Sequence, residues 1–451
     1  MGIASALAFS HRGRRVFAYD VNPRVRASLR SGRSPYREEG LQELLQSEGR
    51  RGRFVVVDTV GELAESARCI FLCLPTPAGR GGRIHLAPLR AGARELGRAL
   101  REVRGYRLVV VKSTVVPGTT ESLVEPILRR ASGKGPESLG VASNPEFLSE
   151  GRMVQDALYP ERIVVGANDG RCFRMLAAVY RGFPAATREL SPSEAELVKY
   201  ASNTFLALKV SFANEISRWT EALGGNVDDV VGALGADRRI GPSFLKAGPG
   251  FGGSCFEKDL RAFVGRAAQL GIRARAAEAT LAINREQTDH VSDLISRTAG
   301  PLRGKSVAVL GVAFKAGTDD VRESRAFPIV EGLVHAGARV RVHDPAALAN
   351  FRREWERRSG TTARSVKFSR SVVDCLRGAD LAVLQAEWPE YLDWPARWSE
   401  AMRTPLVVDL RRALSPSARE GTGLRVVSLG VGRDGRRATL TPPKAATPRR
   451  P

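Results

Sequence analysis

A cysteine in a glycine-rich segment is the most reactive side chain that the sequence presents. Cys255 lies in GPGFGGSCFEKD, residues 248–259, and Lys258 and Asp259 follow it closely. Glycines let a backbone approach a ligand, and a thiol beside charged groups is suited to attack on a carbonyl carbon. A structural cysteine can also occupy such a turn. The choice between a nucleophilic and a structural Cys255 therefore depends on the other segments.

Two polar residues four positions apart are predicted on one face of a helix. Lys199 and Asn203 lie in the segment 191–225, where Ser191 and Glu194 form a capping box and two glycines end the segment. At this spacing both side chains can meet a single substrate oxygen. A solvated lysine beside an ordinary asparagine is the alternative. Read as one helix, the segment is long enough to connect two domains.

Further polar residues follow two predicted strands. ASNPEFLSEG, residues 142–151, carries Glu146 and Glu150, while KSTVVPGTT supplies Thr114 and Pro117. In open parallel sheets, ligands bind at the carboxyl ends of the strands. These residues are therefore candidates for a site, although an isolated glutamate at a strand end is ordinary surface.

The first residues resemble the second half of a dinucleotide-binding unit. Gly2 opens a helical run and fits the third glycine of G-x-G-x-x-G, while Asp20 ends the string RVFAYD at the distance expected for a ribose contact. Asp20 is otherwise a strand-end turn residue. An acidic group there repels a 2′-phosphate, which favours NAD over NADP. The first strand and two glycines are missing, so we hypothesise that the true start lies upstream of Met1.

Alternating strings of β-branched residues and helical stretches predict two doubly wound α/β domains, each with a parallel sheet covered by helices on both faces. The first series ends near residue 166, and the second begins with SVAVLGVAFK at residue 306. We expect an NAD-binding domain over 1–189, a helical middle domain over 190–298 and a second α/β domain over 299–432. Residues 433–451, rich in Pro, Arg and Thr, are expected to be a disordered tail.

Composition excludes several classes of protein. No apolar run is long enough to span a bilayer, and the segment Met1–Phe9 lacks the basic region and the cleavage pattern of a secretory signal. Five scattered cysteines argue against a disulfide framework, so we expect a cytoplasmic location. Cys69 and Cys73 are interpreted as core fillers of a strand. The net charge of +22 comes from arginines spread along the chain without interleaved aromatics, so nucleic acid is not an expected partner.

Seven segments in order resemble the UDP-glucose/GDP-mannose dehydrogenase family. They are KSTVVPGTT, SNPEFLSEG, PERIVVG, ELVKYASNTFLALKVSFANEI, DRRIG, GPGFGGSCFEKD and GVAFKAGTDDVRES. The stretch RIGPSFLKAGPGFGGSCF is more similar to the UDP-glucose branch than to the GDP-mannose or N-acetylhexosamine branches. Glu257 departs from the pattern, since a proline usually precedes the lysine there.

The resemblance implies a four-electron oxidation of UDP-glucose to UDP-glucuronate with NAD and without a metal. Cys255 is then the nucleophile, Lys199 and Asn203 stabilise the oxyanion, Asp259 acts with a water, and Glu146 and Thr114 serve hydrolysis. Implied cofactor contacts are Gly2, Asp20, Pro75, Thr76, Thr114, Glu150, Lys258 and Arg322. Implied substrate contacts are Glu146, Phe147, Leu148, Lys199, Asn203, Arg239, Phe251, Gly252 and Lys315. Arg322 and Arg411 are further candidates for phosphate or subunit contacts, and Arg162 for the cofactor region or the surface.

In this family the last α/β domain holds UDP and the middle helix joins two subunits, which implies a homodimer or a higher homo-oligomer. Two rival functions stay open. One is oxidation of another nucleotide sugar, and the other is a catalytically silent nucleotide-sugar-binding protein that lacks the first strand.

Overall fold

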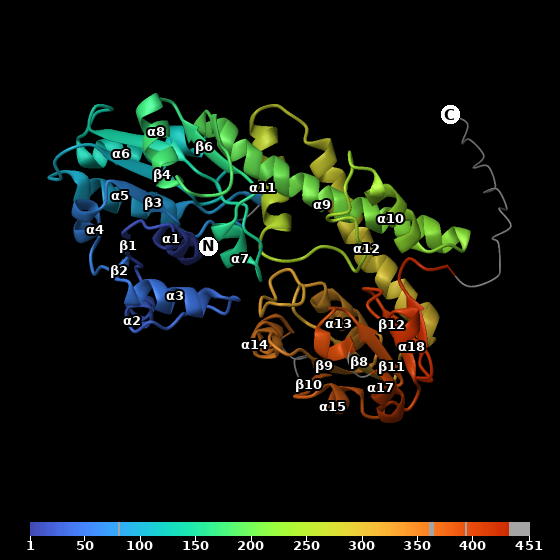
Figure 1. Ribbon diagram of the computed structural model, residues 1–451. Coiled ribbons are helices and arrows are strands. Elements are labelled where there is room, and N and C mark those ends of the chain that lie inside the picture. The colour runs from blue at the N-terminus through green and yellow to red at the C-terminus, as the bar shows by residue number, and fades with distance from the viewer. Residues whose placement is uncertain (80–81, 360–364, 393–394, 433–451) are drawn as a thin grey trace, which may run out of the picture. The chain divides into compact units, whose positions relative to one another are not determined.

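The computed structural model describes residues 1–79, 82–359, 365–392 and 395–432 (Figure 1). The chain forms two compact units. The first comprises Met1–Phe205, Ser254–Glu278 and Gly317–Asp319, and the second comprises the remaining described residues. The predicted tail, residues 433–451, lies outside the described residues.

The first unit holds a two-stranded sheet and a five-stranded sheet. Its strands are β1 (Val16–Ala18), β2 (Phe54–Val56), β3 (Cys69–Leu72), β4 (Arg107–Val111), β5 (Leu139–Ser143), β6 (Ile163–Ala167) and β7 (Thr187–Leu190). β1 pairs with β2, and the larger sheet has the order β3-β4-β5-β6-β7. β5 and β6 pair antiparallel, so the expectation of a wholly parallel sheet was wrong at this pair. β7, with the sequence TREL, was not predicted because it lacks an apolar run.

The division into two sheets matches the missing strand of the sequence pattern. In a doubly wound sheet with the order 3-2-1-4-5-6, strand 1 separates strand 2 from strand 4. Here β1 and β3 occupy the positions of strands 2 and 4, and each ends its own sheet. Helix α1 (Gly2–His11) contacts both, because Phe9 packs in one apolar cluster with Val16 of β1 and Phe71 of β3.

Helices surround these sheets, and one of them, α11, carries Lys258 and Asp259. Besides α1, they are α2 (Pro23–Arg30), α3 (Leu41–Arg50), α4 (Val60–Ser66), α5 (Ala87–Leu100), η2 (Thr120–Val124), α6 (Glu125–Ser132), α7 (Met153–Leu158), α8 (Gly170–Val179) and α11 (Phe256–Gln269). The π-helical turn η2 leads directly into α6, so the segment after β4 turns into a helix within ten residues.

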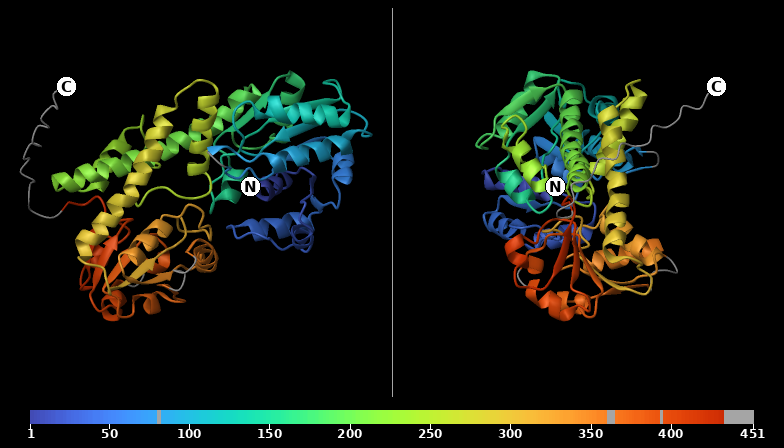
Figure 2. Two further views of the ribbon diagram at one scale, coloured as in Figure 1. Left: turned by 180° about the vertical axis from the view of Figure 1, so that it is seen from behind. Right: turned by 90° about the vertical axis from the view of Figure 1, so that its right-hand side faces the viewer.

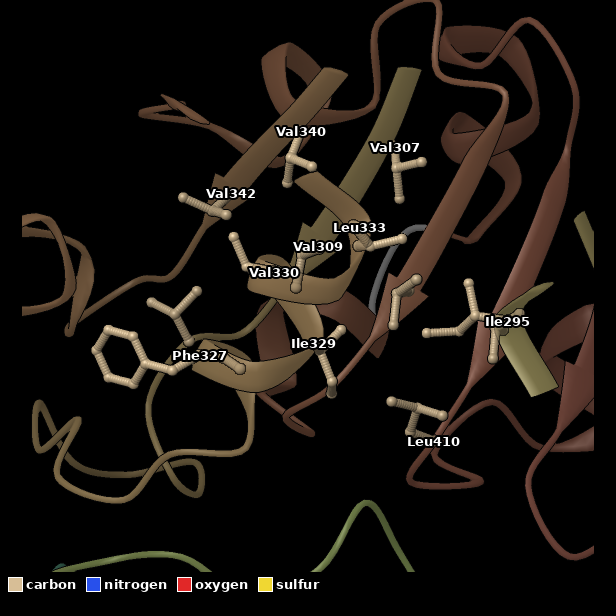
Figure 3. Packing of buried hydrophobic residues seen from close by; sticks show 14 of the residues in the cluster. Ile295, Val307, Val309, Phe327, Ile329, Val330, Leu333, Val340, Val342 and Leu410 are labelled. Atoms are coloured by element: carbon tan, nitrogen blue, oxygen red, sulfur yellow. The ribbon is translucent and has the colours of Figure 1, made fainter. Parts of the chain in front are cut away.

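The second unit contains a six-stranded parallel sheet with the order β10-β9-β8-β11-β12-β13, the doubly wound order. Its strands are β8 (Ser306–Leu310), β9 (Arg339–His343), β10 (Val366–Phe368), β11 (Leu381–Leu384), β12 (Leu406–Asp409) and β13 (Arg425–Ser428). Its helices are α10 (Val227–Ala236), α13 (Ala326–His335), α14 (Leu348–Ser359), α15 (Val372–Leu376), α16 (Pro389–Leu392), α17 (Pro395–Ala401) and α18 (Pro416–Arg419). Figure 3 shows valines of β8 and β9 packed against Phe327, Val330 and Leu333 of α13.

Two long helices complete the fold, and each is unbroken in the views of Figure 2. α9 (Pro192–Leu223) has 32 residues, or roughly 48 Å at about 1.5 Å per residue, and α12 (Arg275–Ala299) has 25. The prediction of two doubly wound domains and a long connecting helix is therefore confirmed. Among the described residues, no helix meets the length and hydropathy needed to cross a bilayer.

Candidate active site

The capping box predicted at the start of α9 is present. The Ser191 amide donates to the Glu194 carboxylate at 2.9 Å, and the Glu194 amide donates to the Ser191 hydroxyl at 3.3 Å. Further along the same helix, Lys199 and Asn203 lie on its buried side, 5% and 6% exposed. A buried lysine requires a partner, so the surroundings of these two residues define the site.

Lys199 forms an ion pair with a glutamate from the end of β5. The Lys199 Nζ lies 3.2 Å from Oε1 of Glu146, and the Leu148 amide donates to Oε2 at 2.6 Å. Burial raises the pKa of Glu146, but Lys199, the Leu148 amide and Lys112 outweigh it and hold the pKa below its ordinary value. Glu146 is therefore a carboxylate at neutral pH, in the form that a general base requires.

Asn203 reaches a carboxylate on α11. Its Nδ2 donates to Oδ2 of Asp259 at 2.7 Å, and Nζ of Lys258 donates to Oδ1 at 2.5 Å. Asp259 is 1% exposed, so these charge-assisted bonds offset the cost of burying it. Lys258, a candidate for the cofactor, thus has an intramolecular partner in this structure.

Cys255 lies at the N-cap of α11, and its carbonyl accepts the Asp259 amide at 2.9 Å. The residue is exposed. Nearby protein still desolvates the sulfur and raises the pKa of the thiol. A contact with the Ser254 hydroxyl at 3.5 Å and the charge of Lys199 oppose that rise, while Asp259 and Glu150 add to it. The Cys255 side chain is consequently a neutral thiol at neutral pH.

The glycine-rich segment before Cys255 needs glycine at particular positions. Gly253 has a φ of +84°, and a Cβ there would come within 2.9 Å of the Phe314 ring. Side chains of the long helices hold the same segment. Asn214 accepts the Gly248 amide at 2.7 Å, and Gln287 donates to the Gly248 carbonyl at 2.8 Å. Sequence reasoning missed these two amides, because nothing local marks a residue of a helix as the partner of a distant loop.

The ends of β3 and β4 are joined by side-chain hydrogen bonds. Thr76 donates to the Thr114 carbonyl at 2.8 Å, and Ser113 donates to the Leu74 carbonyl at 2.7 Å. Pro75 lies between these contacts. The loop after β5 reaches the glycine-rich segment, since Ser254 donates to Oε1 of Glu150 at 3.0 Å. Three strand ends thereby converge with α9 and α11 within the first unit.

Phe147 and Arg162 lie beside the ion pair. The Arg162 guanidinium stacks over the Phe147 ring at 4.1 Å and also donates to Ser202 at 3.1 Å, and Lys199 Nζ lies 5.7 Å from the same ring. The Arg162 side chain therefore contacts α9 and the loop after β5.

The residues predicted near a dinucleotide fit one chemically. α1 begins at Gly2, and a Cβ at that position would lie 3.0 Å from the Cys73 Cβ, a close contact that glycine avoids. The amides of the first turn of a helix suit a pyrophosphate. Asp20 is half-buried just beyond β1, and its Oδ1 accepts the Asn22 amide at 2.8 Å. A carboxylate at that strand end suits ribose hydroxyls.

The remaining predicted residues belong to the second unit. Arg239 is 89% exposed and pairs with Asp237, whereas Arg322 pairs with Asp320. Asn284 accepts the Phe251 amide, and the Arg325 Nε donates to the Phe251 carbonyl. A Cβ added at Gly252 would clash with the Glu323 carbonyl. Lys315 lies over the Phe314 ring. Arg411 donates to the carbonyls of Gln385 and Phe314.

Comparison with known proteins identifies relatives for the whole chain. Three domains of the UDP-glucose/GDP-mannose dehydrogenase family match: the NAD binding domain over 1–184, the central domain over 193–286 and the UDP binding domain over 308–416. A UDP-glucose 6-dehydrogenase of Haloferax volcanii is 38% identical over 93% of this chain and 96% of its own. A UDP-glucose 6-dehydrogenase of Rhizobium meliloti is 36% identical over 95% of this chain and 97% of its own. The solved UDP-glucose dehydrogenase of Pyrobaculum islandicum superposes with a TM-score of 0.87 at 38% identity, covering 96% and 95%.

Proposed function

This chain belongs to the UDP-glucose/GDP-mannose dehydrogenase family, and we propose that it oxidises UDP-glucose to UDP-glucuronate in two hydride transfers. The observation that carries the proposal is the grouping of a thiol, two ion-paired carboxylates, a lysine and an amide within one unit. Lys199, Asn203, Glu146 and Asp259 are linked in pairs, and charges of this group act on Cys255.

The first oxidation needs a proton acceptor and a stabilised oxygen at C6 of the sugar. Asp259, acting through a water, takes the hydroxyl proton, while Lys199 and Asn203 donate to the oxygen as negative charge develops. NAD, when bound, accepts the hydride that leaves C6. The residues that we propose hold it are Gly2, Asp20, Pro75, Thr76, Thr114, Glu150, Lys258 and Arg322.

The second oxidation passes through covalent attachment to Cys255. The thiol adds to the aldehyde carbon, with net transfer of its proton to the aldehyde oxygen, and forms a thiohemiacetal. A second hydride then leaves the same carbon for NAD while the thiohemiacetal hydroxyl gives its proton to the Asp259–water pair, and the carbon becomes that of a thioester. Water then attacks the thioester, Glu146 accepts the water proton with Thr114 orienting that water, and the carbon–sulfur bond breaks. Each turnover consumes one water and two NAD and yields one carboxylate.

Substrate selection is proposed for Phe147, Leu148, Arg239, Phe251, Gly252 and Lys315, with Arg411 and Arg322 as additional anion contacts. We divide the chain accordingly into residues 1–189 for NAD, 190–298 for the middle domain and 299–432 for UDP. A cytoplasmic location is part of the proposal, since all five cysteines are free thiols.

We also propose a homodimer built on α9. Phe212, Trp219 and Leu223 are 43%, 63% and 63% exposed, at spacings of seven and four that place them along one face of the helix. Exposed aromatic side chains in a row are typical of interfaces. Trp219→Glu is expected to convert a dimer to a monomer in sedimentation velocity, and an unchanged sedimentation coefficient would argue against this face.

The decisive experiment supplies the purified protein with NAD and a panel of nucleotide sugars. Two NADH per UDP-glucuronate from UDP-glucose supports the proposal, whereas activity confined to GDP-mannose or a UDP-N-acetylhexosamine replaces the substrate. Cys255→Ala should lose four-electron turnover, while Cys375→Ala, which removes a thiol from the core of the second unit, should retain it. Full turnover by Cys255→Ala would refute covalent catalysis.

The separation of β1 from β3 favours one alternative, a protein that binds a nucleotide sugar without catalysis. Titration of the 451-residue protein with NAD, followed by isothermal calorimetry, distinguishes the two functions. Binding with a Kd below the millimolar range supports the dehydrogenase, and UDP-glucose binding without any NAD binding supports the silent protein.

A further inference from the structure

A second buried glutamate of α9 contacts the turn that follows Thr114. Glu196 is 2% exposed and lies one helical turn before Lys199. Its Oε2 accepts the Gly118 amide at 2.6 Å and the Thr119 amide at 3.1 Å. Its Oε1 accepts the Thr120 amide at 2.9 Å and the Thr120 hydroxyl at 2.6 Å. Four donors therefore converge on one carboxylate.

The helix that carries the nucleophile contacts the same turn. Arg266 of α11 donates from Nε to the Pro117 carbonyl at 3.0 Å. The turn, residues 117–120, is thus held on one side by the Lys199 helix and on another by the helix that begins after Cys255. Hydrogen bonds to a charged group are stronger than those between neutral groups, so this arrangement fixes the backbone of the turn firmly.

We propose that Glu196, together with Arg266, is a positioning residue that sets Thr114 relative to Lys199 and Cys255 and thereby governs hydrolysis of the thioester. The inference rests on the proposed function. Neither Glu196 nor Arg266 is among the residues that we propose contact the sugar or the cofactor. The turn begins three residues after Thr114, with only Val115 and Val116 between, so a shift of the turn is transmitted to the threonine.

In its hydrolytic role, Thr114 acts in the last chemical step. Both hydrides have left the sugar before water attacks the thioester carbon, so at saturating NAD a displaced threonine slows the cleavage of the carbon–sulfur bond. Catalytic groups need placement within about 0.5 Å, and small displacements are enough to slow such a step. The enzyme then accumulates as a thioester on Cys255.

The test is rapid mixing of Glu196→Gln with UDP-glucose and saturating NAD at pH 8.5. An amide places its NH₂ group against the amide donors of the turn, so the contact is weakened without a cavity. We expect a burst approaching two NADH per active site, a steady rate at least tenfold below that of the unmodified protein, and a KM for UDP-glucose within twofold. Mass spectrometry of the quenched protein should show a nucleotide-sugar adduct on the peptide that contains Cys255.

The control is Glu194→Gln, which removes the same charge from an exposed position in the first turn of the same helix and should leave burst and steady rate unchanged. Arg266→Met removes the other contact and should give the same burst. If Glu196→Gln does not fold, the same burst, steady rate and adduct are measured on Arg266→Met. The effects on steady rate should be less than additive in the double variant, because both contacts act on one turn.

A decrease of burst and steady rate in equal proportion, or a steady rate without accumulated adduct, overturns the positioning role. Failure of the proposed function looks different, because the unmodified protein then forms no NADH from UDP-glucose. Thr114→Ala is the positive control and should reproduce the burst.

Discussion

Replacing Lys199 with methionine tests how much the buried ion pair between Lys199 and Glu146 contributes to stability and activity, because the substitution leaves Glu146 buried without its partner. The two charged atoms lie 3.2 Å apart, which corresponds to an attraction of about 5 kcal/mol at an effective dielectric constant of about 20. Removing one member of a buried pair typically costs about 3–5 kcal/mol of folding free energy. Glu146 is 11% exposed and can avoid part of that cost only by binding a proton.

The sign of the pH dependence follows from this argument. In the unmodified protein the pKa of Glu146 is lowered, so its contribution to stability is present above its ordinary pKa and is lost as pH falls. In Lys199→Met the pKa of Glu146 rises, and stability is lost as pH increases. The difference in unfolding free energy between the two proteins should therefore be small near pH 4.5 and reach about 3–5 kcal/mol at pH 8.

Urea denaturation at both pH values measures the difference, and NADH production measures turnover. Lys199→Arg is the matched control, since it keeps the charge and should recover most of the stability. We expect at least a hundredfold loss of kcat in the methionine variant, because one oxyanion donor is worth about two to three orders of magnitude. An equal loss of stability at pH 4.5 and pH 8 would show that Lys199 acts through packing instead.

Three further predictions concern single groups. Because burial raises the pKa of Cys255, alkylation by iodoacetamide should be slower at pH 8 than for a free peptide thiol and should accelerate above pH 9; a rate that is constant from pH 7 upward would contradict this. Burial raises the pKa of Glu196 from 4.5 to about 7, so as pH rises this carboxyl ionises in the unfolded chain before it ionises in the folded protein. The free energy of unfolding should therefore fall by about 3 kcal/mol between pH 4.5 and 7. Urea denaturation of Glu196→Gln at the same pH values should lack this decrease. Asp20→Ser removes the charge opposed to a 2′-phosphate and should lower the ratio of kcat/KM for NAD over NADP at least tenfold, and an unchanged ratio would place the ribose elsewhere.

Much of the fold follows from local patterns. The β-branched strings predicted β8 to β13, and the spacing of Lys199 and Asn203 predicted a shared helix face because helical geometry requires it. The direction of β6 was wrong, since an apolar run that is buried on both faces has the same composition in parallel and antiparallel pairing.

The candidate site was predictable in its residue types and less so in its pairings. Lys258 and Asp259 are adjacent in sequence, yet their ion pair depends on how α11 begins. The contact between Glu196 and the turn after β4 joins residues 76 to 78 positions apart, and Arg266 reaches the same turn from 149 positions away. Such contacts depend on tertiary packing, and no periodicity along the chain encodes them.

The separation of the N-terminal sheets has a consequence for local stability. β1 and β3 each have one edge whose amide and carbonyl groups are not paired with another strand in the described chain, and β1 and β2 have only three residues each. Opening this ribbon breaks few contacts, so its amides should exchange with deuterated solvent far sooner than those of β8, which has a neighbour on both sides. A protease should accordingly cleave the lobe formed by α2, α3 and the ribbon sooner than the sheet of the second unit.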